Sequence, residues 1–281
     1  MGCLNSDKNF QHWFGNIHLS GPCNRSCYFC IGQHMMDLDP FNNLDKFPLK
    51  NLDQFLIECN EKNIYEINIT GSNTDPLLYK YTEQLRYKLD ERIPGLIMGV
   101  RTNGAAYSKY DLLKYYNKGS ITICSTEPDI YLKMMGKGIM PDIEKFLGAT
   151  YHFSELKVNI VLGPENFSNG DVLNTIQILS TYGIKKFNLR EPYGQPHVGD
   201  PIAYFGGRKI KEIYGMPTYE VCGSEVVYWD VHYVEVESIN LYANGNISYD
   251  YPITRGHSEN GKVLSQDKFE YGRHNEQWIK I

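Results

Sequence analysis

The sequence has no long apolar run. No stretch of about 18 consecutive apolar residues, the length that spans a bilayer, occurs in its 281 residues. Its first ten residues also lack the basic segment followed by an apolar stretch that marks a secretory signal. We therefore expect a cytoplasmic protein with no membrane partner.

Positive charge is also scarce. The chain has 28 Lys and Arg residues against 33 Asp and Glu residues, which gives a formal net charge of −5. Proteins that bind nucleic-acid polymers rely on lysine and arginine to neutralise phosphates, so this balance disfavours polymeric nucleic acid as a partner. No repeat, low-complexity tract or linker rich in Gly, Pro and Ser divides the chain, and its hydrophobic share of 42% is typical of a globular protein with one main core.

What the sequence does contain is a regular alternation of two patterns. Short β-branched runs predict buried strands at 17–19, 64–70, 96–101, 121–124, 156–162 and 186–189. Segments with helical spacing lie between them, at 52–59, 77–89, 109–116, 143–146 and 171–182. A repeated strand and helix predicts an α/β fold, in which a parallel sheet has helices outside and binds ligands at the carboxyl ends of its strands.

The pattern changes from about Pro201. Tyrosine-rich strand candidates follow at 225–236 and 239–249, and Asn244-Gly245 predicts a tight turn because both residues tolerate a positive φ. We interpret residues 1–191 as the core and residues 192–281 as a C-terminal antiparallel β extension that covers the substrate side. Arg255, His257 and Arg273 in this tail are interpreted as solvated loop residues, with a place at the site as the alternative.

Cysteines supply the most specific chemical signal. The chain has seven, and in a reducing cytosol these are metal ligands or thiols rather than a disulfide framework. Three of them, Cys23, Cys27 and Cys30, form a Cys-x3-Cys-x2-Cys loop after the first predicted strand. Three thiolates on one loop can bind three irons of a cubane and leave the fourth iron open, whereas structural zinc usually has four protein ligands in two separated pairs.

This spacing, with the aromatic Phe29 just before the third cysteine, resembles the hallmark of the radical S-adenosylmethionine (radical SAM) superfamily. The resemblance covers about residues 15–191 and implies a partial (β/α)6 barrel of the TIM type. It also implies a [4Fe-4S] cluster on Cys23, Cys27 and Cys30, with S-adenosylmethionine as the second cofactor. The alternative is a zinc knuckle that borrows a histidine such as His34; otherwise His18 and His34 are interpreted as core or loop histidines.

The resemblance also implies a reaction. An electron from the reduced cluster splits S-adenosylmethionine into methionine and a 5′-deoxyadenosyl radical, and this radical removes a hydrogen atom from a bound substrate. The protein holds the target C–H bond near the radical carbon and excludes water, because the cofactor supplies the difficult chemistry. An electron donor such as flavodoxin or ferredoxin is the implied protein partner.

Two strand ends carry polar residues similar to the cofactor-binding segments of the superfamily. After the second strand, Gly71, Ser72 and Asp75 stand where members hold the methionine amino group, although two residues are inserted and aspartate replaces the usual glutamate. An Asx turn that opens a helix at Pro76 is the alternative for this segment. After the third strand, Thr102 and Asn103 resemble a common Thr-Asn-Gly segment, which is also an ordinary turn.

The next strand ends add three further candidates. Ser125 stands where members often place a serine or an acid against the ribose or the methionine carboxylate. Asn159, in an apolar strand, resembles a buried Asn of molybdenum-cofactor-type members, and it needs hydrogen-bond partners from the cofactor or the protein. Arg190 would face the open end of the sheet, with a salt bridge to Glu191 as the alternative.

The other cysteines, at positions 3, 59, 124 and 222, form no Cys-x2-Cys pair. We therefore expect a single-cluster enzyme that acts on a small molecule such as a nucleotide, nucleoside or sugar. Cys124 or Cys222 is a candidate hydrogen donor to a product radical, with a buried inert thiol as the alternative. A radical SAM enzyme that modifies a peptide or RNA, and a non-catalytic metal-binding module, are the alternative functions.

Overall fold

A computed structural model describes residues 13–35, 41–167, 170–192, 202, 206–213, 215–229, 236–249, 258–259 and 262–263. The sequence positions Cys3, Arg255, His257 and Arg273 lie outside these residues.

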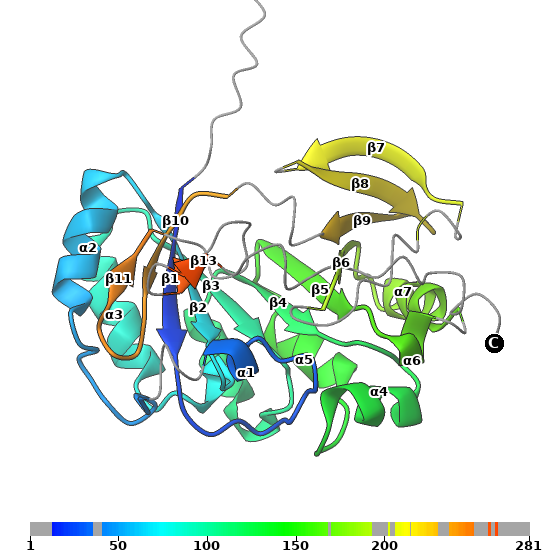
Figure 1. Cartoon of the computed structure of the whole chain (residues 1–281), viewed down its shortest axis with the longest axis horizontal. Helices are drawn as coiled ribbons and strands as arrows, with labels where there is room; N and C mark the ends of the chain where they lie inside the picture. Colours follow the sequence, from blue (N-terminus) through cyan, green and yellow to red (C-terminus); the bar gives the residue numbers. More distant parts are fainter. Residues whose placement is uncertain are drawn as a thin grey trace, which may run out of the picture.

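One mostly parallel sheet organises the chain (Figure 1). Its eleven strands follow the order β11-β10-β1-β2-β3-β4-β5-β6-β9-β8-β7, and the run from β10 to β9 is parallel throughout. The parallel strands are β1 (Phe14–Leu19), β2 (Glu66–Gly71), β3 (Ile97–Thr102), β4 (Lys118–Thr122), β5 (Glu155–Val161), β6 (Lys186–Arg190), β9 (Ser224–Trp229) and β10 (Ser238–Leu241). The antiparallel strands are β7 (Arg208–Ile213), β8 (Met216–Val221) and β11 (Ile247–Ser248), and a separate pair is formed by β12 (Ser258–Glu259) and β13 (Lys262–Val263).

The six strands predicted for the core all overlap β1 to β6. The predicted antiparallel tail holds for the β7–β8–β9 meander and for the β10–β11 hairpin, which turns at Gly245 with φ 89°. The sequence pattern did not predict two parallel pairings of the tail. Strand β9 pairs in parallel with β6, and β10 pairs in parallel with β1. Residues after 191 therefore extend the sheet at both of its edges.

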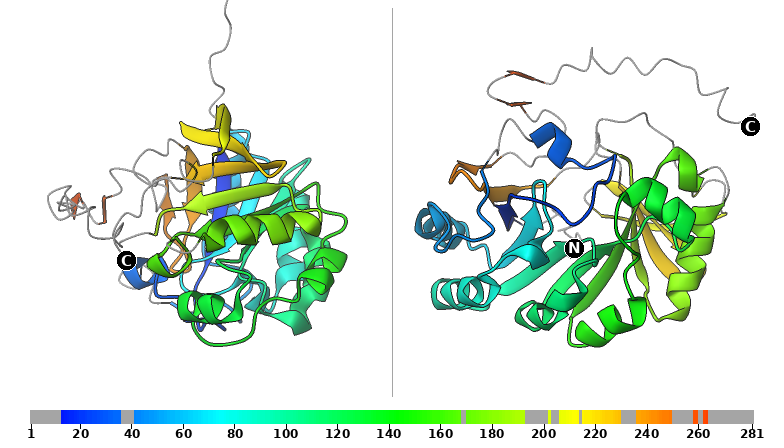
Figure 2. Two further views of the ribbon diagram at one scale, coloured as in Figure 1. Left: turned by 90° about the vertical axis from the view of Figure 1, so that its right-hand side faces the viewer. Right: turned by 90° about the horizontal axis from the view of Figure 1, so that it is seen from below.

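Helices cover the outer side of this sheet, which curves around an open inner side (Figure 2). They are α2 (Leu52–Glu61), η1 (Pro76–Leu78), α3 (Thr82–Arg92), η2 (Tyr107–Tyr115), α4 (Pro128–Met135), α5 (Ile143–Ala149), α6 (Pro164–Phe167) and α7 (Asp171–Thr181). The short helix α1 (Gly32–Met35) lies apart from them, on the open side. The predicted helix at 77–89 is divided into η1 and α3, and the one at 109–116 is a 3-10 helix. Among the described helices, none is long and apolar enough to cross a membrane.

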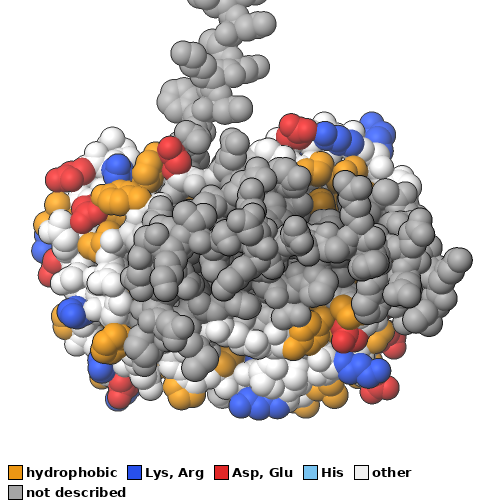
Figure 3. Space-filling model, in the orientation of Figure 1, with side chains coloured by type: hydrophobic (Ala, Val, Ile, Leu, Met, Phe, Trp, Pro, Cys, Tyr) orange, Lys and Arg blue, Asp and Glu red, His pale blue; other side chains and the backbone are white. Residues whose placement is uncertain are grey.

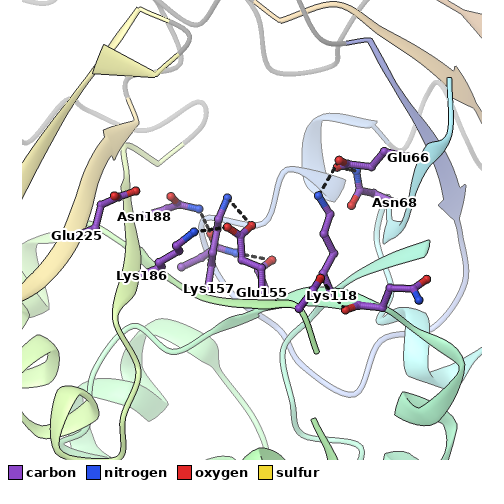
Figure 4. Close-up of polar contacts among 12 residues, drawn as sticks. Glu66, Asn68, Lys118, Glu155, Lys157, Lys186, Asn188 and Glu225 are labelled. Carbon is purple, nitrogen blue, oxygen red and sulfur yellow. Dashed lines mark hydrogen bonds and ion pairs between the residues drawn. The ribbon is translucent and has the colours of Figure 1, made fainter. Parts of the chain in front are cut away.

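Alternation along each strand separates an apolar outer face from a polar inner face. Outward side chains such as Ile67 and Ile69 are fully buried in the core beneath the helices, and Gly15 lets Phe55 of α2 approach β1 closely. Inward side chains are largely polar, and Figure 4 shows several of them pointing away from the helices below. Lys118 pairs with Glu66 at 2.7 Å there, one of several charged contacts near the amino ends of the strands. The sheet therefore has a dry side that stabilises the fold and a polar side that is available to ligands.

Candidate active site

The cysteine loop lies at the carboxyl end of β1 and runs into α1. Cys23, Cys27 and Cys30 are partly buried free thiols, and all three line one cavity of roughly 270 Å³. The Cys30 amide donates to the Cys27 carbonyl at 3.2 Å, which closes a turn between them. The structure therefore brings the three predicted ligands to a single cavity, together with Phe29.

Arg25 fixes this loop to the segment that follows α4. Its side chain is buried, with Nη1 donating to the Lys137 carbonyl at 2.7 Å and Nη2 donating to the Ile139 carbonyl. The guanidinium also lies 5.1 Å from the ring centroid of Tyr131, within the range of a cation–π contact. The Ser26 amide adds a hydrogen bond to the Met135 carbonyl. These contacts hold the cysteines in place through a residue whose role the sequence motif does not indicate.

The turn after β2 lies directly against the cysteine loop. The Ser72 amide donates to the Leu19 carbonyl at 2.8 Å, and the Thr74 hydroxyl donates to the Pro22 carbonyl at 2.7 Å. The Asn73 side-chain oxygen accepts from Ser20 and from the Gly21 amide. Gly71 is required where the turn begins, because a Cβ there would lie 1.8 Å from the Thr74 carbonyl oxygen.

Asp75 is the capping residue of this turn. Its Oδ1 accepts from the Leu77 amide at 2.9 Å, which opens η1 with Pro76 at its start. The Thr102 hydroxyl reaches both carboxylate oxygens, and the Asn103 amide donates to Oδ2 at 2.6 Å. Asp75 thus forms the predicted Asx turn while also lining the cavity. It connects the carboxyl ends of β2 and β3 through buried hydrogen bonds.

Asn159 and Arg190 form the opposite wall of the cavity. Asn159 donates to the Ser120 hydroxyl at 3.0 Å, and its oxygen accepts from Asn188 at 3.0 Å and from Arg190 Nε at 3.2 Å. Protein side chains therefore supply the partners that a buried amide needs. The Arg190 guanidinium also lies 4.9 Å from the Trp229 ring centroid. The neighbouring Glu191 accepts a hydrogen bond from the Tyr228 hydroxyl at 2.5 Å.

Two predicted site residues do not line the cavity. Ser72 is buried in the turn after β2. Ser125 is fully buried, and its hydroxyl donates to Asp171 of α7 at 3.0 Å and accepts from the Glu127 amide at 2.9 Å. These contacts place Ser125 between the end of the β4 segment and the start of α7.

The inner wall contains residues that the sequence motifs did not single out. His18, Thr70, Arg101 and Thr122 line the cavity from β1 to β4, and Met135 lines it from α4. Each of the four strand residues occupies an inward position of its strand. Alternation along the predicted strands was the available signal, but it could not indicate which inward positions meet in one cavity.

The remaining described cysteines lie apart from the three on the loop. Cys59 is buried on the outer side of the sheet, with its sulfur 3.6 Å from where a Gly15 Cβ would be. Cys222 is exposed in the turn between β8 and β9. Cys124 is buried with its sulfur 3.5 Å from that of Met135, and it does not line the cavity.

Solved structures share this architecture. No family model matches the chain, and no curated protein matches its sequence. The structure of Streptococcus suis SuiB bound to the precursor peptide SuiA matches 86% of this chain and 60% of SuiB, at 13% identity and a TM-score of 0.54. A second SuiB structure matches 85% of this chain and 60% of SuiB, at 14% identity and a TM-score of 0.53.

The chain therefore shares its fold with the SuiB structures. It spans about 41–60% of the SuiB chains that it matches.

The three cysteines form a donor set that suits a cluster, in which each thiolate binds a separate iron. Burial, and then the neighbouring Cys30 and Cys23 thiols, raise the pKa of Cys27 to about 12; burial also raises the pKa of Cys23 and of Cys30. Bound metal cations would favour the thiolate form of these cysteines. Among the described side chains, no three His, Cys, Asp or Glu residues converge on one metal ion. Cysteines that bind separate irons of a cubane do not need to converge. His34 belongs to α1, and its side chain is outside the described residues.

Proposed function

We propose that this chain is a radical SAM enzyme that cleaves S-adenosylmethionine reductively and removes a hydrogen atom from a small-molecule substrate. Cys23, Cys27 and Cys30 would hold one [4Fe-4S] cluster, which supplies a single electron to the sulfonium when it is bound. The observation that carries the proposal is the shared cavity, in which the cysteine loop meets polar side chains from the carboxyl ends of neighbouring parallel strands. Ligands bind at this end of parallel α/β sheets.

Strands β1 to β6 are best understood as the partial (β/α)6 barrel that the sequence resemblance implies, and β10 and β9 add one parallel strand at each of its edges. Its carboxyl ends would hold S-adenosylmethionine between the turn at Gly71, the β3 end at Thr102 and Asn103, and the wall at Asn159 and Arg190. Phe29 would pack beside the bound cofactor. Ser72 and Asp75 would act by shaping the turn, because their described contacts are within the protein. Ser125 would act through α7, which its bond to Asp171 positions.

The proposed reaction has two steps. One electron and S-adenosylmethionine give methionine and a 5′-deoxyadenosyl radical, and a hydrogen atom then moves from a substrate C–H bond to the 5′ carbon. Apolar surface in the same cavity comes from Ile31, Met135 and Val161. Such surface would exclude water from the bound cofactor and substrate. The extension at 192–281, which flanks the sheet at both edges, would cover the substrate side.

The substrate class has two candidates. The described cysteines outside the loop are dispersed, which favours a single-cluster enzyme acting on a nucleotide, nucleoside or sugar. The match to a SuiB structure that contains the precursor peptide SuiA favours a peptide as the second candidate. Product analysis of reactions with each class, scored by substrate-dependent formation of 5′-deoxyadenosine, separates the two.

The test of the proposal is anaerobic reconstitution with iron and sulfide. We expect about four irons per chain and 5′-deoxyadenosine on reduction with dithionite in the presence of S-adenosylmethionine. Cys27→Ala should lose the iron–sulfur absorbance and the product, whereas the matched control Cys222→Ala, at an exposed cysteine outside the cavity, should retain both. Copurified zinc with no product would favour the metal-binding module. Equal 5′-deoxyadenosine from wild type and Cys27→Ala would rule out the enzymatic function.

A further inference from the structure

An exposed surface of mixed character lies beside the cysteine loop. Leu132 and Lys133 in the last turn of α4, together with Lys137 and Ile139 just after it, form what we call the α4 patch. Leu132 is 43% exposed and Ile139 is 68% exposed, and both lysines are also exposed. The patch therefore combines two exposed apolar side chains with two cations in one short segment.

The backbone of this patch is the same backbone that holds the cysteines. The carbonyls of Lys137 and Ile139 accept from Arg25, and the Met135 carbonyl accepts from the Ser26 amide. The Met135 sulfur lies 3.8 Å from the Cys27 sulfur. Met135 is itself buried, so one layer of protein separates the exposed residues of the patch from the proposed cluster. In Figure 1, α4 and the cysteine loop both lie along the lower edge of the molecule.

Two lysines give the patch a local positive charge. Neither Lys133 nor Lys137 forms an ion pair with a described residue, and the acids of α4, Glu127 and Asp129, stand at the other end of the helix. The formal charge of the whole chain is −5. An acidic protein is therefore repelled by the molecule as a whole and attracted locally at this site. Figure 3 shows basic, acidic and hydrophobic side chains near one another along the lower edge of the molecule.

We propose that the α4 patch is the docking surface of an acidic one-electron carrier protein of the flavodoxin or ferredoxin class. The inference rests on the proposed function, since the carrier loses one electron and the cluster gains it. Electron transfer weakens steeply with distance, which favours a donor bound over the thinnest wall beside the cysteines. Complexes of redox proteins have small interfaces and rely on charge to steer encounter, and a few lysines around an apolar contact meet both needs.

The experiment compares two reductants on the reconstituted holoenzyme. In the double variant Lys133→Glu/Lys137→Glu, we expect 5′-deoxyadenosine formation driven by a reduced, negatively charged flavodoxin to fall roughly tenfold at low ionic strength. Formation driven by dithionite, which needs no docking, should stay at the wild-type rate. The loss should appear mainly as a higher KM for flavodoxin and should shrink as salt is added, because exposed charges are screened.

A matched control makes the same charge change elsewhere. Lys114→Glu/Lys185→Glu alters two exposed lysines near the amino ends of β4 and β6, at the opposite end of the parallel strands. It should leave both reactions unchanged. If the patch variant and this control reduce the flavodoxin reaction equally, or if neither does, the docking proposal is wrong. Absence of product from wild type with dithionite would instead overturn the proposed function on which it rests.

Discussion

His18 shows how much the surroundings of one side chain determine its chemistry. The Asn240 amide nitrogen faces the Ser248 carbonyl at 3.3 Å, which can only accept, so the Asn240 oxygen faces His18 Nε2 at 3.3 Å. His18 Nε2 must therefore carry the proton. The ring also stacks on Tyr242 with centroids 4.7 Å apart, and its Nδ1 is buried without a hydrogen-bond partner. A neutral imidazole in this state presents an acceptor at the wall of the cavity.

The protonation of His18 gives a prediction with a defined sign. Burial lowers its pKa to about 4, and Arg101 acts in the same direction while the Asn240 hydrogen bond opposes it. The unfolded chain binds this proton below about pH 6.5, so stability decreases as the pH falls from 6.5 towards 4. Between pH 7.5 and 5, urea unfolding of wild type should show about 2 kcal/mol more loss than His18→Gln.

The control for this pH dependence is His152→Gln, which removes an exposed imidazole. It should keep the wild-type slope of stability against pH. An imidazole resonance of His18 that titrates near pH 6.5 in the folded protein would contradict the assignment.

The sequence predicted residues whose chemistry is local and missed those whose role depends on the fold. Cys23, Cys27 and Cys30 were singled out by their spacing along the chain, and they do share a cavity. Arg25 stands within the same motif, yet its partners are more than a hundred residues away, so its anchoring role could not be predicted. The same reason applies to Ser125, whose contact with Asp171 depends on how α7 packs.

At the scale of elements, the turn from β2 to η1 combines local and tertiary constraints. Asp75 caps η1 and also satisfies the Asn103 amide at the end of β3. In Asp75→Ala both amides lose their acceptor in a buried setting. We expect a loss of about 2–4 kcal/mol in the free energy of unfolding, measured with urea.

Asp142→Ala is the matched comparison, because Asp142 caps α5 through one bond to the Lys145 amide at an exposed site. It should cost about 1 kcal/mol or less. Equal losses for the two variants would show that Asp75 contributes no more than a surface cap.

Strand positions were predictable because β-branched runs report burial directly, and each of the strands β1 to β6 overlaps one of these runs. The bounds and types of the helices were less predictable. The predicted helix at 77–89 is interrupted because Tyr79 is extended, with ψ 128°, and η2 adopts the tighter 3-10 form, although both segments have apolar residues at helical spacing. Apolar periodicity indicates which face is buried and does not distinguish these helix types.

At the scale of the whole molecule, the tail strands complete the sheet at both edges. Val226 of β9 and Ile239 and Leu241 of β10 are buried in the main core, and each contributes about 1.5–3 kcal/mol on burial. Their sum approaches the 5–15 kcal/mol that stabilises an ordinary domain. A chain of residues 1–191 should therefore fail to fold cooperatively and should aggregate through the uncovered edges of β1 and β6.

Far-UV circular dichroism and size-exclusion chromatography provide the measurement, with residues 1–249 as the control that retains β9 to β11. A monomeric 1–191 chain with a cooperative melting transition would show that the core is independent of its extension. The sequence could not settle this point, because a strand pattern does not specify its partner, and β9 and β10 join strands that are distant in sequence.

The separation of an apolar convex face from a polar concave face of the sheet has an evolutionary consequence. Mutations on the concave side, at cavity positions such as Thr70 and Thr122, can alter which molecule is accepted while the packing beneath the helices stays as it is. Residues that contact a ligand and residues that pack in the core thus alternate along the same strands, and selection can change the first set while the second set is kept.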